Sequence, residues 1–112
     1  MQPAVDEFIS NLEALASGSY LREEDRTFWE QPFDPAALPN LRAILEGYLD
    51  TLDAAQDEAG AQRATATFIE QVEEFNAGHA GAVVEQEEIE ELNGLIRGAV
   101  PQEFQENLPL FE

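Results

Sequence analysis

Apolar residues recur every three or four positions along nearly the whole chain, a spacing typical of amphipathic α-helices. The first segment shows this most clearly, because one helical face would carry Val5, Phe8, Ile9, Leu12 and Leu15. No segment shows the alternation of apolar and polar residues, bounded by hairpin turns, that predicts a β-strand. The sequence therefore predicts an all-α fold.

Prolines and glycines divide this pattern into five expected helices, since both residue types favour helix ends. Their expected ranges are 3–17, 20–31, 39–59, 61–77 and 82–99. In the second range, Leu21, Phe28 and Trp29 are expected on the inner side, and Gly60 is expected to end the third helix. The proline-rich segment 32–39 is a connector that Phe33 and Leu38 should attach to the core.

The length and composition fit one domain with a modest hydrophobic core, because 44% of the 112 residues are apolar. Short connections favour antiparallel neighbouring helices. We therefore expect a single compact bundle of four to five helices over residues 1–100. A short, extended C-terminal tail should follow over residues 101–112, either packed on the bundle or free.

The charge is strongly unbalanced: 24 acidic residues oppose five arginines, and the formal net charge is −19. Such a chain is repelled by nucleic acid and by anionic membranes, so neither is an expected ligand. A basic protein partner is favoured instead. An acidic surface kept only as an adaptation to a salty habitat remains an alternative that needs no partner. With no cysteine, no signal peptide and no apolar run of about 20 residues, we expect a soluble, cytoplasmic protein.

Four carboxylates in the expected third helix would form one acidic stripe, because they are spaced i, i+4, i+7 and i+11: Glu46, Asp50, Asp53 and Asp57. Neighbouring members of such a stripe lie about 6 Å apart, close to the spacing of phosphates along a nucleic-acid strand. These four residues are the first candidates for contact with a basic partner, including a partner that normally binds DNA.

A second candidate for partner binding is the acidic cluster within the expected fifth helix, at Glu87, Glu88 and Glu91. Its simplest interpretation is a solvated helix face. The string Glu87-Glu88-x-x-Glu91 also resembles half of the metal motif of the all-α nucleotide pyrophosphatases of the MazG type. That resemblance implies a carboxylate-only, metal-dependent enzyme, although the Glu-x-x-Asp of the motif's second half is absent after residue 91.

The sequence offers few residues for other kinds of catalytic chemistry. His79 is the only histidine, and it lies in a glycine-flanked turn where we expect an exposed side chain. Without cysteine or a second histidine, no zinc site can be assembled from the usual nitrogen and sulfur ligands. Phosphate-binding glycine loops and nucleophile motifs are also missing. We therefore expect no enzymatic activity, no catalytic residue, no cofactor and no bound metal.

The tail contains the string Asn107-Leu108-Pro109-Leu110-Phe111. It resembles the short peptides with which bacterial polymerases and their accessory proteins dock on the DNA sliding clamp. Those peptides typically read Gln-Leu-x-Leu-Phe, so Asn107 stands where glutamine is usual. The resemblance implies that Leu110 and Phe111 fill an apolar pocket of the clamp, while Asn107 makes polar contacts.

These observations favour a non-catalytic acidic protein that binds a basic surface of a protein partner, as an inhibitor, an immunity-like protein or a DNA mimic. Three alternatives stay open. They are an accessory protein docked on the sliding clamp through its tail, a carboxylate-only metal-dependent enzyme, and a helical domain whose acidity is only solvent adaptation. The oligomeric state does not follow from the sequence.

Overall fold

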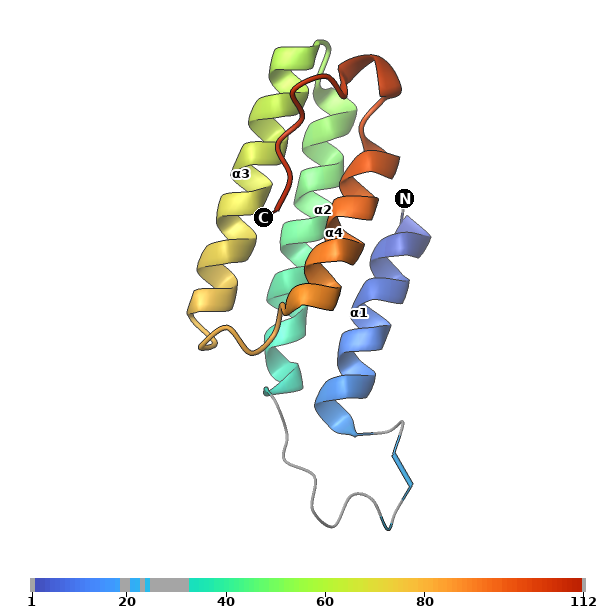
Figure 1. Cartoon of the computed structure of the whole chain (residues 1–112), viewed down its shortest axis with the longest axis vertical. Coiled ribbons are helices and arrows are strands. Elements are labelled where there is room, and N and C mark those ends of the chain that lie inside the picture. Colours follow the sequence, from blue (N-terminus) through green and yellow to red (C-terminus); the bar gives the residue numbers. More distant parts are fainter. Residues whose placement is uncertain (1, 19–20, 23, 25–32, 112) are drawn as a thin grey trace.

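The computed structural model describes residues 2–18, 21–22, 24 and 33–111. Within this part the fold has no strand and four helices that pack side by side: α1 (Gln2–Ser17), α2 (Leu38–Ala54), α3 (Glu58–Ala77) and α4 (Gln86–Ala99). Each helix runs antiparallel to the one before it (Figure 1). The predicted all-α bundle is confirmed.

Helix α1 begins and ends as the sequence predicts. Pro3 lies in the first turn, where its missing amide hydrogen costs no helical hydrogen bond. Gly18 follows the last turn with a φ of +69°, a left-handed conformation that glycine adopts without strain. Its amide donates to the carbonyl of Ala14 at 2.9 Å, so this helix end is satisfied locally.

The connector to α2 is attached to the core as expected, because Phe33 and Leu38 are both buried. Between them, the carboxylate of Asp34 accepts a hydrogen bond from the amide of Ala36 and caps a short 3-10 helix, Pro35–Ala37. Of the helix expected over 20–31, only Leu21, Arg22 and Glu24 are described, and none of them is helical. The rest of that range, including Phe28 and Trp29, lies outside the described residues.

The boundary between α2 and α3 differs from the prediction. Helix α2 ends at Ala54 rather than at Gly60, because Asp57 starts the next helix. The Asp57 carboxylate accepts a hydrogen bond from the amide of Gly60 at 2.7 Å, the arrangement of an N-cap. Gly60 therefore lies in the first turn of α3, which begins at Glu58 instead of residue 61.

The connection from α3 to α4 is organised by Asn76. Its side-chain oxygen accepts hydrogen bonds from the amides of Val83 and Val84, and its side-chain amide donates to the carbonyl of Val84. These bonds hold the segment after residue 81 in a non-helical conformation. Helix α4 therefore begins at Gln86 and not at residue 82, although Val84 is buried as predicted.

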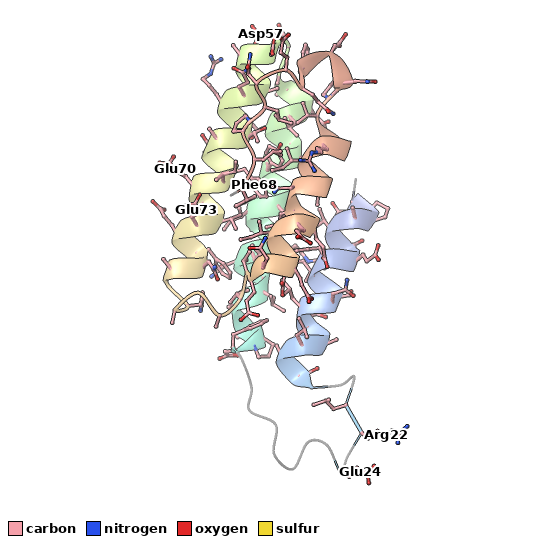
Figure 2. The ribbon with its side chains drawn as sticks, in the orientation of Figure 1. Arg22, Glu24, Asp57, Phe68, Glu70 and Glu73 are labelled. Carbon is pink, nitrogen blue, oxygen red and sulfur yellow. The ribbon has the colours of Figure 1, made fainter. Side chains whose placement is uncertain are left out.

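Aromatic residues form the centre of the core. The ring of Phe68 stacks on Tyr48 with centroids 4.3 Å apart, and only 1% of Phe68 is exposed. The buried hydroxyl of Tyr48 forms a hydrogen bond of 2.8 Å with Thr65, whose hydroxyl also donates to the carbonyl of Ala61. Figure 2 shows Phe68 pointing into the bundle, whereas Glu70 and Glu73 of α3 point away from it.

The C-terminal tail is packed on the bundle rather than free. After a short 3-10 helix (Gln102–Phe104), it runs back beside α3 and α4 (Figure 1). Phe111 is 9% exposed and meets Phe68 edge to face, with centroids 5.9 Å apart. The amide group of Asn93 in α4 bonds both the backbone amide and the carbonyl of Phe111. This packing joins the end of the tail to the core.

Candidate partner-binding site

The acidic stripe expected on one helix is divided between two elements. Glu46, Asp50 and Asp53 lie on α2, whereas Asp57 caps α3. Figure 2 shows Asp57 at the end of the bundle where α3 begins. The prediction of one continuous stripe is therefore wrong. The Asp57 carboxylate accepts a hydrogen bond from the Gly60 amide and starts a new helix, so α2 ends earlier than the apolar pattern suggested.

Glu46 also differs from Asp50 and Asp53 on the same helix, because it has partners within the fold. The side-chain amide of Gln2 donates to it at 2.8 Å, and Arg42 lies 4.0 Å away. The same guanidinium pairs with Asp6 on α1 and, together with the Gln2 amide, holds the pKa of Asp6 below its ordinary value. This small network joins α1 to α2. The other two stripe residues on α2, Asp50 and Asp53, are exposed and form no ion pair among the described residues.

The second predicted cluster lines a groove between α1 and α4. Glu87, Glu88 and Glu91 form its α4 side, and the groove has a volume of about 270 Å³. The α1 side is mostly apolar and consists of Phe8, Asn11, Leu12, Ala14 and Leu15. A second hollow of about 460 Å³ continues along the same two helices past Glu91. The cluster is thus the charged wall of an amphipathic groove.

Glu88 is not on a solvated face, contrary to the sequence-based expectation. Only 8% of the residue is exposed, while Glu87 and Glu91 beside it are exposed. Burial is the main reason that the pKa of Glu88 is raised, and the nearby charges of Glu85, Glu87 and Glu91 raise it further. A hydrogen bond with its own backbone opposes this effect without cancelling it. No described arginine pairs with the Glu88 carboxylate.

A larger groove, of about 650 Å³, lies between α2 and α3 and has a different lining. None of the residues that line it is a carboxylate, and its one charged residue is Arg63. Much of its surface comes from small residues such as Gly47, Ala54 and Ala64. Nothing in the sequence pattern indicated this groove, which contains no carboxylate.

The tail residues proposed for clamp docking have structural roles in this fold. Asn107 has a φ of +62°, in the left-handed region that asparagine tolerates better than most residues. This turn explains an asparagine at position 107 without reference to a partner. Leu108 and Leu110 are half-buried on the bundle, and Phe111 is buried. Docking of this segment elsewhere would require Phe111 to leave the core.

Among the described residues, no three histidine or acidic side chains are placed so that they could hold a metal ion. His79 is half-buried rather than exposed, because its ring lies against Phe75 with centroids 4.7 Å apart. No helix in the described part of the chain combines the length and the apolar character needed to cross a membrane.

The groove residues on α1 were missed because their role depends on tertiary packing. Periodicity places Leu15 on the buried face of α1, yet 38% of it is exposed, the largest exposure of a large apolar residue among the described ones. It lies in the last turn of the helix, on the wall of the α1–α4 groove. In the sequence, the only sign of this groove was a large apolar side chain close to a helix end.

Comparison with known proteins adds no functional assignment: no protein-family model, no curated protein and no solved structure matches this chain.

Proposed function

We propose that this chain is a non-catalytic acidic interaction protein that binds a basic surface of a protein partner. An inhibitor, an immunity-like protein and a DNA mimic would all act in this way. Long-range attraction would steer the partner and select against acidic competitors, and a small apolar contact would hold the complex.

The observation that carries this proposal is that the negative charge is not neutralised within the fold. Among the described residues, the only ion pairs join Arg42 to Asp6 and Glu46. The other described carboxylates form no ion pair there, and nearly all of them are exposed. Such a surface repels itself in the free protein, and a basic partner would relieve that repulsion.

The α1–α4 groove supports the proposal further, because it combines the two kinds of contact that a partner would need. Its carboxylates lie opposite the exposed Leu15, so charge and apolar surface face one another. Asp50 and Asp53 are exposed on α2, but they line neither the α1–α4 groove nor the α2–α3 groove. The groove is therefore the better candidate for the centre of an interface.

The test is capture of proteins from the native lysate on the immobilised chain, at physiological ionic strength and at about 1 M salt, where charge is screened within about 3 Å. Two variants of equal net charge are compared with the wild type. Glu87→Gln/Glu91→Gln removes charge from the groove, whereas Glu70→Gln/Glu73→Gln removes it from the outer face of α3. We expect one basic protein at a fixed ratio, lost at high salt and lost from the groove variant only.

Other outcomes would favour the alternatives. Capture of no protein at either salt would contradict the proposal and favour an acidity kept for solvation. A partner that survives high salt and is lost after Leu110→Ser would favour docking through the tail. This substitution leaves Phe111 in place, so it tests the tail without removing a core residue.

A further inference from the structure

We propose that the α1–α4 groove receives a single long basic side chain, arginine or lysine, of the protein partner. The stem of that side chain would lie on the apolar wall of α1, and its charged end would meet the carboxylate of Glu88. This inference rests on the proposed function, because it names the chemical group by which the partner is held.

The shape of the groove fits a side chain better than a whole ligand. Its volume of about 270 Å³ is below the range of about 300–1,000 Å³ typical of small-molecule sites. Phe8, Leu12 and Leu15 supply an apolar wall, and 38% of Leu15 remains exposed. The stems of lysine and arginine pack on such surfaces while their charged ends reach a polar group.

The burial of Glu88 without a counter-ion is the second observation that points to a cation. Only 8% of this residue is exposed and it lines the groove, yet no described cation lies beside it. Burying a carboxylate without a counter-ion is costly, and the raised pKa of Glu88 reflects that cost. A basic group in the groove would supply the missing counter-ion, while Glu87 and Glu91 would contact the same charge from the rim.

A metal ion fits this groove less well than an organic cation. Magnesium and calcium need oxygen ligands on all sides, and magnesium usually keeps several of its waters. Here the carboxylates come from α4 alone, and Asn11 is the one polar side chain on the α1 wall. Guanidinium and ammonium groups on aliphatic stems match a groove that is charged on one side and apolar on the other.

The experiment uses N-acetyl-arginine amide as the probe and follows the backbone amides of the ¹⁵N-labelled protein by NMR. N-acetyl-citrulline amide has nearly the same shape without the charge and serves as the control ligand. We expect saturable shifts confined to residues 8–15 and 85–92 for the arginine probe, and none for citrulline. Glu88→Gln should weaken this binding about tenfold, whereas Glu90→Gln, on the same helix but outside the groove, should change it less than about twofold.

Three results would overturn the groove proposal: unchanged affinity in Glu88→Gln, equal shifts with citrulline, or shifts spread over all exposed carboxylates. The amide spectrum of Glu88→Gln shows whether that variant remains folded.

Magnesium chloride, titrated in place of the arginine probe, should cause no saturable shift in the groove, and a saturable one would favour a metal site instead. If the probe finds no site while the lysate partner is still lost from Glu87→Gln/Glu91→Gln, the groove proposal fails and the proposed function stands. If the probe binds but no partner is captured, the proposed function fails alone.

Discussion

The two grooves of the bundle are similar in origin and opposite in lining. Each runs along a seam between two helices, but the α1–α4 groove has three carboxylates and the α2–α3 groove has none. Near the end of the α2–α3 groove, the carboxylate of Asp57 is used to cap α3. Glu88, in the α1–α4 groove, has no comparable partner on another residue.

This difference argues against an acidity that is uniform over the surface. Solvent adaptation places carboxylates on well-exposed positions, whereas Glu88 is only 8% exposed. The α2–α3 groove shows that the same acidic sequence can line a hollow without any carboxylate. The placement of charge between α1 and α4 therefore needs its own explanation, which a cationic partner would supply.

The largest expected effect comes from removing the aromatic ring that forms part of the α2–α3 groove. Phe68→Ala should lower the free energy of unfolding by about 3–5 kcal/mol, because Phe68 packs on both Tyr48 and Phe111. Urea denaturation measures the loss. Leu15→Ala in the wall of the α1–α4 groove is the comparison, and it should cost less than about 1 kcal/mol because Leu15 is partly exposed. Equal losses would contradict the burial of Phe68 and the partial exposure of Leu15.

The next effect distinguishes a structural carboxylate from a free one. Asp57→Ala should lower the free energy of unfolding by about 1–2 kcal/mol, since it removes the cap of α3. Asp53→Ala, on an exposed position of α2, should change it by less than about 0.5 kcal/mol. Thermal melts of both variants make the comparison. A cost at Asp53 as large as at Asp57 would contradict the assignment of the cap.

Glu88→Gln should act in the opposite direction and stabilise the free protein at pH 7 by about 1 kcal/mol, because it removes a buried charge. Glu90→Gln is the matched control, and it should change the free energy of unfolding by less than about 0.5 kcal/mol. Loss of stability in Glu88→Gln would show that the carboxylate has a partner in the free protein, and the contrast between the grooves would disappear.

The stability difference between Glu88→Gln and the wild type should depend on pH. The folded-state pKa of Glu88 is raised above its ordinary value of 4.5, with Glu85, Glu87 and Glu91 on α4 adding to the effect of burial. On the α1 side, Glu7 lines the adjoining hollow. The folded state therefore holds the Glu88 proton more tightly than the unfolded state, and the wild type gains stability as pH falls through this pKa towards 4.5. The advantage of Glu88→Gln over the wild type should shrink over that range, and melts that keep a constant difference would contradict this.

The smallest expected effect tests whether the α2–α3 groove is open. A β-carbon at Gly47 would meet no atom within 4 Å, so Gly47→Ala should stabilise α2 by about 0.5–1 kcal/mol. A β-carbon at Gly60 would lie 3.1 Å from the Asp57 carboxylate, so Gly60→Ala should show no such gain. Urea denaturation of the two variants provides the measurement. A destabilising Gly47→Ala would mean that the groove is filled.

Periodicity predicted the all-α bundle and the buried face of α1 from Val5 to Leu12, because the buried residues of an amphipathic helix recur every three or four positions. It did not locate the end of α2 or the start of α4. Those ends depend on single side chains, Asp57 and Asn76, whose hydrogen bonds compete with continuation of the helix. Apolar spacing is unaffected by such residues, so it overran both boundaries.

The candidate site was predicted only in part. The sequence singled out Glu87, Glu88 and Glu91, but it treated them as one solvated face and did not pair them with α1. Which of three adjacent carboxylates becomes buried depends on how α4 is rotated against Phe8 and Leu12. That rotation is a property of the assembled bundle, and composition or charge patterning of one helix does not determine it.

The aromatic contacts at the end of the tail have a spectroscopic consequence. Because Phe68 is face-on to Tyr48 and edge-on to Phe111, its ring current should shift the ring protons of both neighbours away from their free positions. The Tyr48 and Phe111 signals therefore make an intrinsic reporter that needs no label. Release of the tail would return Phe111 to an unshifted position while Tyr48 kept most of its shift, so a single proton spectrum would distinguish an undocked tail from an unfolded bundle.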